Sequence, residues 1–408
     1  MRKYKTLKAV FHQFDAQVAE AEERRRREVG FETSFTVGDY RLFYVATPQL
    51  LNIQEQVLLN ERALELLAFD IPVAAQRSYL FDLITQEISA TNEIEGVRST
   101  RREIVEALQA EPSENKRFRE IARLYLELSK GAIEAPESAQ QVRYIYNQLL
   151  GDEIEPDDVP DGKLFRAGPV WVRDGAGKNI HAGAKDEEKI DGQLKAMFDH
   201  LSADDVPFIV SRLVSHFMFE ATHPFYDGNG RFGRFLLSVQ LQAVFSSYTV
   251  LTLSHIINTQ KDKYYKAFVE VENDLNRGDA TLFAQVMLEL LRDAQLHLIQ
   301  DFNAKKELME VLSQRVNTLM DEAEDLSKGA IDSLFVFGQA FLFGGSVGLD
   351  WDTLAGVLAK SKNTARKYID ELESAGLLQR ASSRPLRLTL SKDGVAFLSL
   401  ERVPSDAS

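Results

Sequence analysis

The sequence predicts a mainly α-helical protein that carries one β-hairpin in its middle and a winged helix-turn-helix domain at its C-terminal end. Across most of the 408 residues, apolar side chains recur every three or four positions, as they do on the buried face of a helix. The period changes at residues 165–183, where two strand-like segments flank a turn-rich spacer. From Leu349 onward the pattern is a short helix, a turn, a second helix and a hairpin.

The composition narrows the classes of protein that the chain can represent. It is 44% hydrophobic, which is enough for large cores and argues against global disorder. The net charge of −14 argues against a protein that coats nucleic acid or an acidic membrane with its whole surface. Because there is no cysteine, neither a disulfide nor a cysteine-ligated zinc site can form. No apolar run approaches the roughly 20 residues of a membrane span, and no apolar signal-peptide segment follows Met1. We therefore expect a cytoplasmic protein without a membrane partner.

Residues 223–234 are the stretch around which the rest of the chain is arranged. They read His-Pro-Phe-Tyr-Asp-Gly-Asn-Gly-Arg-Phe-Gly-Arg. Apolar residues at helical spacing lie on both sides, at Val210, Leu213, Val214, Phe217, Met218 and Ala221 before the stretch and at Phe232, Phe235, Leu236, Val239 and Ala243 in and after its end. This pattern predicts a tight loop between two core helices, with residues 228–230 opening the second helix.

The residue types in this stretch suit one site for phosphoryl or nucleotidyl transfer. Backbone N–H groups at a helix start have no partner within the helix, and glycines let them approach an anion closely. Arg231 and Arg234 add two guanidinium groups for a polyphosphate. Asp227 could hold Mg²⁺ on phosphate oxygens, and His223 could accept a proton from an attacking hydroxyl. A lone histidine before proline is usually a helix end and a lone Gly-Asn-Gly a turn, so the prediction rests on the whole constellation.

The twelve residues also resemble the Fic motif, His-Pro/x-Phe-x-Asp/Glu-Gly-Asn-Gly-Arg-x-x-Arg. Most Fic proteins transfer AMP from ATP to a Ser, Thr or Tyr hydroxyl of a protein. The resemblance implies that His223 is the general base, that Asp227 is the Mg²⁺ ligand and that Phe225 anchors the loop. ATP and Mg²⁺ are then the expected substrate and cofactor, and Arg234 would reach the γ-phosphate. The implied nucleotide-binding set is Asp227, Gly228, Asn229, Gly230, Arg231, Phe232, Gly233 and Arg234.

A second segment of interest runs over residues 79–96. Its apolar residues keep helical spacing, and Gly96 is a natural residue for the end of a helix. Glu95 therefore lies at the negative end of the helix dipole, where a cation would relieve the repulsion. Spacing alone leaves a local salt bridge open, and the candidate cations are Arg98, Arg101 and Arg102.

The end of this segment also resembles the inhibitory signature of Fic proteins, Ser/Thr-x-x-x-Glu-Gly/Asn. Here the signature falls on Thr91, Glu95 and Gly96, ahead of the Fic motif and in the same chain. The resemblance implies that Glu95 pairs with Arg234 in the place of the γ-phosphate and keeps the enzyme idle. In relatives the same glutamate can position a water that removes AMP, so de-AMPylation is a second expected activity.

The hairpin predicted at residues 165–183 has two interpretations. It is either an ordinary surface hairpin or, by its place upstream of the motif, the counterpart of the Fic flap, which pairs with the target polypeptide as an added strand. By resemblance the flap residues are Ile180, His181, Ala182 and Gly183. A metal site at His181 is the less favoured interpretation.

Tyr264 and Tyr265 follow the motif on a predicted helix with Phe268. Packing is the ordinary interpretation of such a pair. Fic proteins often carry two tyrosines here that contact adenosine, so both are also candidate nucleotide-binding residues. The asparagine that accompanies them in the family falls at Glu272 or Asn273 here, which leaves its assignment open.

The remaining elements are expected to be mostly helical. Residues 1–30 predict a single polar helix, and Pro48 marks the start of the next one. Further helices are expected at 104–108, 118–128, 142–150 and 280–325. An acidic, proline-bearing loop is expected at 152–160 and a hinge at 344–348.

The C-terminal winged helix-turn-helix is predicted from helices at 351–358 and 362–378 and a wing around 386–390. Between residues 351 and 402 there are nine Lys and Arg against six Asp and Glu, in a chain that is acidic overall. Four polar or basic residues open the second helix, where DNA contacts usually arise: Lys362, Asn363, Arg366 and Lys367. Because such domains also dock proteins, DNA binding and protein binding both stay open.

These observations predict three regions, namely an N-terminal helical region (1–110) with an inhibitory helix, a Fic catalytic core (111–300), and a linker helix with the winged-helix domain (301–408). The expected function is a protein adenylyltransferase that modifies a target protein, or itself, and is held inactive by Glu95. One alternative is a nucleotide-sensing DNA-binding regulator, and another is the transfer of a different nucleotide such as UMP. The sequence leaves the target and a homodimer open.

Overall fold

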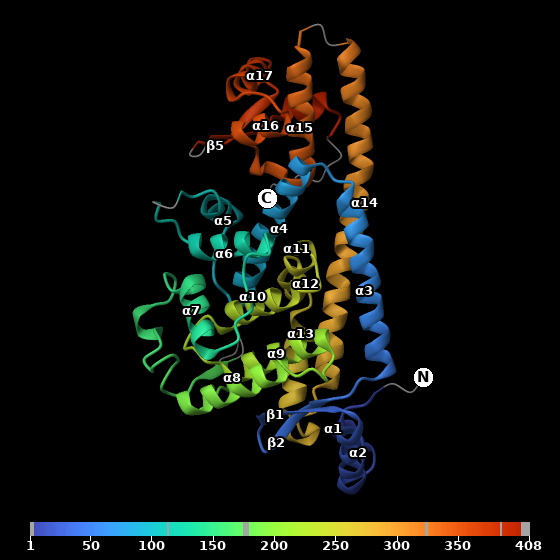
Figure 1. Cartoon of the computed structure of the whole chain (residues 1–408), viewed down its shortest axis with the longest axis vertical. Coiled ribbons are helices and arrows are strands. Elements are labelled where there is room, and N and C mark those ends of the chain that lie inside the picture. The colour runs from blue at the N-terminus through green and yellow to red at the C-terminus, as the bar shows by residue number, and fades with distance from the viewer. Residues whose placement is uncertain (1–3, 112–113, 174–178, 323–324, 384–385, 401–408) are drawn as a thin grey trace. The chain divides into compact units, whose positions relative to one another are not determined.

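The computed structural model describes residues 4–111, 114–173, 179–322, 325–383 and 386–400. Most described residues are helical, and the strands among them form three antiparallel two-stranded sheets. The prediction of a mainly α-helical fold is therefore confirmed. Figure 1 shows the elements in chain order. Among the described residues, no helix combines the length and the apolar character that a membrane crossing requires.

The chain divides into two compact units whose segments alternate along the sequence. The first comprises residues 1–61, 87–99 and 120–295, and the second comprises residues 62–86, 100–119 and 296–408. Three long helices are divided between the two units: α3 (Pro48–Phe69), α4 (Val73–Ile94) and α14 (Thr281–Glu322). Helix α6 also crosses the division, but only with its first residue, Arg119. The three consecutive regions predicted from the sequence remain a prediction about domains.

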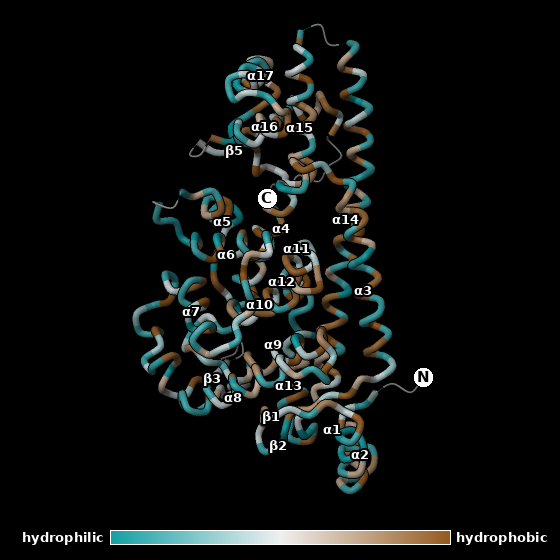
Figure 2. The backbone as a smooth tube through the Cα atoms, in the orientation of Figure 1, coloured by the Kyte–Doolittle hydropathy of each residue, from teal (hydrophilic) through white to brown (hydrophobic). Residues whose placement is uncertain are grey.

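The first unit begins with two short helices and a hairpin. Helices α1 (Leu7–Gln13) and α2 (Ala16–Val29) precede strands β1 (Phe31–Val37) and β2 (Tyr40–Tyr44). The prediction of one helix over residues 1–30 was wrong, because Asp15 adopts an extended backbone and its side chain caps a new helix at the N–H of Val18. Hydrophilic residues dominate α2 (Figure 2), so it needs polar anchoring.

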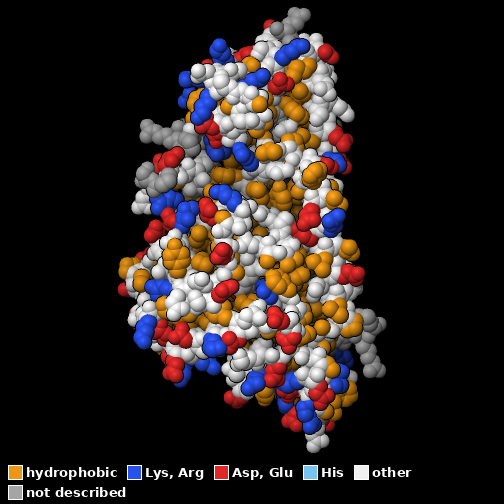
Figure 3. Space-filling view, viewed as in Figure 1, with side chains coloured by type: hydrophobic (Ala, Val, Ile, Leu, Met, Phe, Trp, Pro, Cys, Tyr) orange, Lys and Arg blue, Asp and Glu red, His pale blue; other side chains and the backbone are white. Residues whose placement is uncertain are grey.

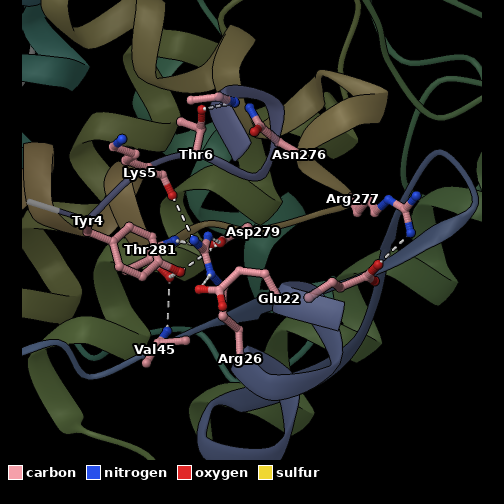
Figure 4. A network of polar contacts seen from close by, with 12 residues as sticks. Tyr4, Lys5, Thr6, Glu22, Arg26, Val45, Asn276, Arg277, Asp279 and Thr281 are labelled. Carbon is pink, nitrogen blue, oxygen red and sulfur yellow. Dashed lines mark hydrogen bonds and ion pairs between the residues drawn. The ribbon is translucent and has the colours of Figure 1, made fainter. Parts of the chain in front are cut away.

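That anchoring comes from a buried network around Arg26 (Figure 4). Arg26 donates to Asp279 at 2.8 Å, to Glu22 at 2.9 Å and to the backbone oxygen of Lys5 at 2.9 Å. The hydroxyl of Tyr4 donates to the same Asp279 carboxylate at 2.7 Å. Because each of the three guanidinium nitrogens donates a hydrogen bond, the buried charge is paired and a mostly polar helix stays attached to the end of the helical core.

The core of the first unit forms around the helices that flank the central motif. Helix α9 (Phe208–Thr222) packs between α8 (Glu187–Leu201) and α10 (Asn229–Leu241), as Figure 1 shows. Nearly every residue of α9 and α10 is buried, so the helix pair predicted from the apolar spacing is present. The other helices of this unit are α6 (Arg119–Ser129), α7 (Ala139–Leu150), α11 (Ser247–Val250), α12 (Leu253–Thr259) and α13 (Lys261–Glu272).

A second hairpin in this unit corresponds to the predicted one. Strands β3 (Trp171–Arg173) and β4 (Asn179–Ala182) are antiparallel and pair Trp171 with Ala182. The strands are shorter than the sequence pattern suggested. The expected acidic loop precedes them and contains only one 3₁₀ turn, η1 (Pro156–Asp158).

The C-terminal end of the second unit contains helices and a hairpin in an order compatible with the predicted winged helix. Helices α16 (Trp351–Val357) and α17 (Lys362–Ser374) are followed by the antiparallel strands β5 (Leu378–Ser383) and β6 (Leu386–Leu390) and by helix α18 (Lys392–Phe397). Helix α17 ends four residues before the predicted boundary, because Gly376 adopts a positive φ of 72° and turns the chain into β5. The unit also holds α5 (Arg101–Leu108) and α15 (Lys328–Gly344). The predicted hinge is the end of α15 and a 3₁₀ turn at Gly345–Val347.

Candidate active site

The central motif forms a closed loop between α9 and α10. His223 ends α9 with a left-handed backbone (φ 52°), and Gly228 precedes α10 with φ 77°. The side chain of Asn229 closes the loop, since it accepts from the N–H of Phe225 at 2.9 Å and donates to the oxygen of Phe225 at 2.8 Å. Backbone turns at both ends and one amide bridge across them thus fix the loop.

Aromatic packing holds this loop in the core. Phe225 is fully buried and stacks on Tyr146 of α7 with ring centroids 3.5 Å apart. The hydroxyl of Tyr146 donates to the backbone oxygen of Asp227 at 2.9 Å, and burial raises the pKa of Tyr146 above its ordinary value. The position of Phe225 matches the anchoring role that the resemblance implies.

Arg166 was not predicted as a site residue, and its side chain is fully buried against the end of α9. Its Nε donates to the backbone oxygen of His223 at 2.8 Å, and its Nη2 donates to that of Thr222 at 3.3 Å. Burial lowers the pKa of Arg166 to about 10. The guanidinium therefore caps the negative end of α9 and fixes the backbone of the candidate base.

The end of the β3–β4 hairpin lies directly against His223, the candidate general base. A Cβ atom at Gly183 would lie 2.9 Å from Cβ of His223 and 2.7 Å from Nη2 of Arg166. Only a residue without a side chain fits between them. Ala182, the other described flap residue, pairs with the exposed Trp171. The side chains of Ile180 and His181 lie outside the described part of the chain.

Arg234 meets the end of α4, as the resemblance implied. Its Nη2 donates to Oε1 of Glu95 at 2.8 Å and to the backbone oxygen of Thr91 at 3.1 Å, while its Nε donates to the Thr91 hydroxyl at 2.9 Å. Burial by itself would lower the pKa of Arg234, but the neighbouring Glu95 carboxylate raises it above its ordinary value. The local salt bridge that spacing left open does not involve Glu95; Arg101 pairs with Asp82 and Arg102 pairs with Glu106.

The Glu95 carboxylate also lies on the glycine turn that opens α10. A Cβ atom at Gly230 would lie 2.2 Å from Oε1 of Glu95 and 2.7 Å from its carboxyl carbon. The start of α10 is where an anion finds unpaired backbone N–H groups. Glu95 thus takes the position that suits an anionic ligand of the helix start.

Arg231 is held by a carboxylate that no motif indicated. Its Nη1 donates to Oε2 of Glu153 at 2.8 Å, and its Nη2 lies 3.5 Å from Oδ2 of Asp227. The Arg231 side chain is 3% exposed and the Asp227 side chain 54% exposed. The only signal for Glu153 in the sequence was its place in the acidic loop at 152–160, which holds four other carboxylates.

Asp227, the predicted Mg²⁺ ligand, has an exposed carboxylate. Among the described residues, no three His, Asp or Glu side chains form a ready-made metal cluster. Mg²⁺ is commonly held by one or two carboxylates together with substrate phosphates. A single carboxylate beside a phosphate-binding helix start is compatible with that mode.

The two tyrosines of α13 have different environments. Tyr264 is 2% exposed, and its hydroxyl lies 2.7 Å from Nε2 of His216. Burial lowers the pKa of His216 to about 3, so its ring is neutral. Tyr265 is 39% exposed and is therefore the better placed of the two for a ligand. Asn273 caps the next turn through the N–H of Leu275, and the nucleotide contacts remain predictions.

The candidate DNA-contacting residues lie in the second unit, at the start of α17. Figure 3 shows Lys and Arg side chains around this helix. All four of them are exposed: Lys362, Asn363, Arg366 and Lys367. Lys362 forms an ion pair with Asp352 at 2.8 Å, and Arg366 lies over the ring of Trp351. Their contact with DNA remains a prediction.

Several solved structures are similar to this chain in fold. One match is to a structure described as a Fic family protein from Desulfovibrio desulfuricans. The match covers 86% of this chain and 98% of that chain, with 17% identity and a TM-score of 0.50. Fic-1 (residues 134–508) from C. elegans matches with 19% identity over 63% of this chain and 75% of its own, with a TM-score of 0.43. A Fic-domain-containing signaling protein from Bacteroides thetaiotaomicron matches with 16% identity over 63% of this chain and 97% of its own, with a TM-score of 0.39.

The fold comparison rests on the first of these structures. Proteins of the Fic/DOC family are generally transferases of a nucleotidyl or other phosphate-containing group. Residues 136–241 match the model of that family. The matched residues run from just before α7 to the end of α10 and include His223, Arg231 and Arg234.

Proposed function

We propose that the protein is an autoinhibited adenylyltransferase that moves AMP from ATP to a Ser, Thr or Tyr hydroxyl of a target protein or of itself. The observation that carries this proposal is the position of Glu95. Its carboxylate lies against Gly230 and is bonded to Arg234, so that an anion already occupies the start of α10. A site that accepts a carboxylate there is suited to a phosphate group.

In the proposed reaction, His223 accepts the proton of the target hydroxyl. The hydroxyl oxygen forms a bond to the α-phosphorus of ATP, and the bond from that phosphorus to the bridging oxygen breaks, so that pyrophosphate leaves. Asp227 would hold Mg²⁺, which neutralises charge on the phosphate oxygens. The start of α10 and the two arginines position the phosphates. Arg166 fixes the backbone of His223 through its carbonyl oxygen.

The hairpin β3–β4 is the proposed binding place for the target polypeptide. Its base touches His223 through Gly183, so a strand added to the hairpin would bring a hydroxyl close to the base. Main-chain pairing of this kind needs little side-chain sequence. Glu95 would block the γ-phosphate position, and removal of AMP from a modified protein is a second proposed activity of the same site.

The test is incubation of the wild type, Glu95→Gly and His223→Ala with isotopically labelled ATP and Mg²⁺, followed by mass spectrometry of the intact proteins and of added lysate proteins. We expect an added AMP with Glu95→Gly, far less with the wild type and none with His223→Ala. Glu93→Gly is the matched control, because Glu93 lies on the same helix end but bonds to Asn258 rather than to Arg234. A parallel reaction with UTP separates AMP transfer from UMP transfer. No adduct in any variant with either nucleotide would contradict the proposal.

A second candidate function rests on the exposed basic residues of α17. A nucleotide-sensing regulator would bind a defined duplex tightly, and its affinity would fall with salt concentration. Electrophoretic mobility shift with a duplex library at two salt concentrations tests this function. Substitution of both Arg366 and Lys367 by Ala should weaken binding if it exists, and no retardation at low salt would exclude it.

A further inference from the structure

The first arginine of the motif, Arg231 in α10, points to a residue outside the Fic motif that has a role in the reaction. Arg231 is almost fully buried and forms a 2.8 Å ion pair with Glu153, whose side chain is 13% exposed. The ion pair joins the loop after α7 to the third residue of α10. A buried arginine needs such a partner, and a charge-assisted bond also fixes the direction of its planar group.

The loop that carries Glu153 is held to the rest of the site at several points. At its far end, the Asp161 carboxylate accepts from the Tyr226 hydroxyl at 2.9 Å, and Tyr226 belongs to the central motif. Beyond Asp161, the carboxylate of Glu187 accepts from three consecutive backbone N–H groups, those of residues 163–165. Next to Glu153, the side chain of Ile154 lies against Gly228. Glu153 is thus presented by a loop that is fixed to the active-site loop.

Glu153 and Glu95 differ in whether a phosphate can bind while the carboxylate stays in place. An arginine has five N–H donors, and the described contacts of Arg231 use Nη1 for Glu153 and Nη2, at 3.5 Å, for Asp227. Its Nε is buried and has no hydrogen-bond partner among the described residues. The guanidinium carries more N–H groups than these two contacts use, so Arg231 can bind a phosphate oxygen and keep its bond to Glu153. Glu95, by contrast, lies on Gly230 in the space of the anion itself.

We propose that Glu153 is a positioning residue that holds the Arg231 guanidinium in place for the phosphates of the nucleotide and stays bound to it during the reaction. This proposal rests on the proposed function, because it assigns Arg231 to the nucleotide of that reaction. It assigns to Glu153 a role opposite to that of Glu95, although each carboxylate pairs with one arginine of the same helix turn.

The experiment compares four full-length proteins: Glu95→Gly as the parent, and the parent carrying Glu153→Gln, Glu153→Asp or Glu155→Gln. Glu155 is the control, because it lies in the same loop and its side chain is exposed. Calorimetry gives the Kd for Mg-ATP, and AMP-transfer kinetics give KM and kcat. We expect Glu153→Gln to raise Kd and KM about tenfold, in the range typical of residues that orient a ligand-binding group, with a smaller change in kcat. Glu153→Asp keeps the charge at a shorter reach and should recover part of the loss, and Glu155→Gln should match the parent.

Unchanged Kd and KM in Glu153→Gln would overturn the proposal. A lower Kd would also overturn it, because Glu153 would then compete with the nucleotide as a second inhibitory carboxylate. If the parent binds Mg-ATP but transfers nothing, the proposed function fails while the Kd values still decide the role of Glu153. If the parent binds no nucleotide, both proposals are contradicted. Thermal unfolding checks that each variant is folded, and Glu153→Asp keeps the test decisive should the Gln variant not fold.

Discussion

Arg231 and Arg234 lie three residues apart on one helix turn, and each forms a 2.8 Å ion pair with a carboxylate from another part of the chain. The Glu153 side chain is 13% exposed and comes from a loop fixed to the active site. The Glu95 side chain is 32% exposed and lies just beyond the last residue of α4. One type of contact can therefore support a ligand site or block it, depending on whether the carboxylate lies beside the anion position or in it.

The largest effect on AMP transfer is expected when the candidate general base, His223, is removed. In the Glu95→Gly background, His223→Ala should lower the rate of AMP transfer by about 10²–10⁴-fold, the usual contribution of a positioned base. The Kd for Mg-ATP should stay near that of the parent, because His223 lies before the phosphate-binding turn. Single-turnover kinetics and calorimetry measure the two quantities. If His223→Ala also weakened Mg-ATP binding, His223 would support the nucleotide site itself. The rate of AMP transfer could then not be separated from binding when the two arginines are compared.

Release of Arg234 should give the next largest effect. Glu95→Gly is expected to raise AMP transfer about 5- to 150-fold, the range of a typical coupling free energy between two sites. The physical reason is that Arg234 and the glycine turn become available to the γ-phosphate. Initial rates at saturating Mg-ATP check this, with Glu93→Gly as the control. Equal rates for the wild type and Glu95→Gly would remove Glu95 from the inhibitory role.

A smaller effect should follow from the second contact of α4 with Arg234. Thr91→Val removes the hydroxyl that accepts from Nε of Arg234 and keeps the shape of the side chain. Because Arg234 keeps its bonds to Glu95 and to the Thr91 backbone, we expect only the loss of a typical hydrogen bond, which should raise AMP transfer by about two- to tenfold. Thr85→Val is the matched control, because the Thr85 hydroxyl bonds to the backbone oxygen of Phe81 in its own helix. A decrease in rate would show that Thr91 serves the active form of the site.

The smallest expected effect is a pH dependence of the stability of the protein, and it comes from Glu87 on α4. Glu87 lies two turns before Glu95, is fully buried and accepts from the N–H of Ser254 at 2.9 Å. Burial raises the pKa of Glu87 to about 7 from an ordinary value of 4.5. The folded protein therefore keeps a proton there that the unfolded chain releases, so the stability contribution is full below pH 4.5 and is lost as the pH rises through 7.

Urea unfolding between pH 4 and pH 8 tests this, as the wild type should lose stability relative to Glu87→Gln over that range. Parallel pH profiles for the two proteins would contradict the shifted pKa. A rate of AMP transfer that rises with pH in the wild type, but not in Glu87→Gln, would extend the comparison, since it would show that Glu87 helps to keep Glu95 on Arg234.

Much of the fold followed from local patterns, and the site followed from them only in part. The apolar spacing around residues 223–234 and the glycine at position 96 placed α9, α10 and the end of α4, because these features act within one or two turns of helix. The contact of Glu95 with Arg234 needed the resemblance to Fic proteins, since 139 positions separate the two residues. Arg166 and Glu153 were missed because a single arginine or glutamate in a loop carries no periodic signal, and only the tertiary structure shows their partners.

The N-terminal region shows the same limit. Residues 1–30 have the composition of one polar helix, but the cap at Asp15 divides them, and the hairpin that follows packs on α8. Arg26 looked like one charge in a solvated run, whereas it is buried on Asp279, 253 positions away. Such long-range ion pairs decide which charged residues are structural, and sequence spacing does not record them.

We propose that Glu95 and Glu153 act on the site in opposite directions, and a double-mutant cycle measures both effects together. The measurement is kcat/KM for AMP transfer by the wild type, Glu95→Gly, Glu153→Gln and the double variant. All four proteins are measured over the same series of Mg-ATP concentrations. We expect kcat/KM to rise for Glu95→Gly and to fall for Glu153→Gln, with the double variant close to the product of the two factors. A rise for Glu153→Gln would contradict the opposite roles, because it would make both carboxylates inhibitors of one site.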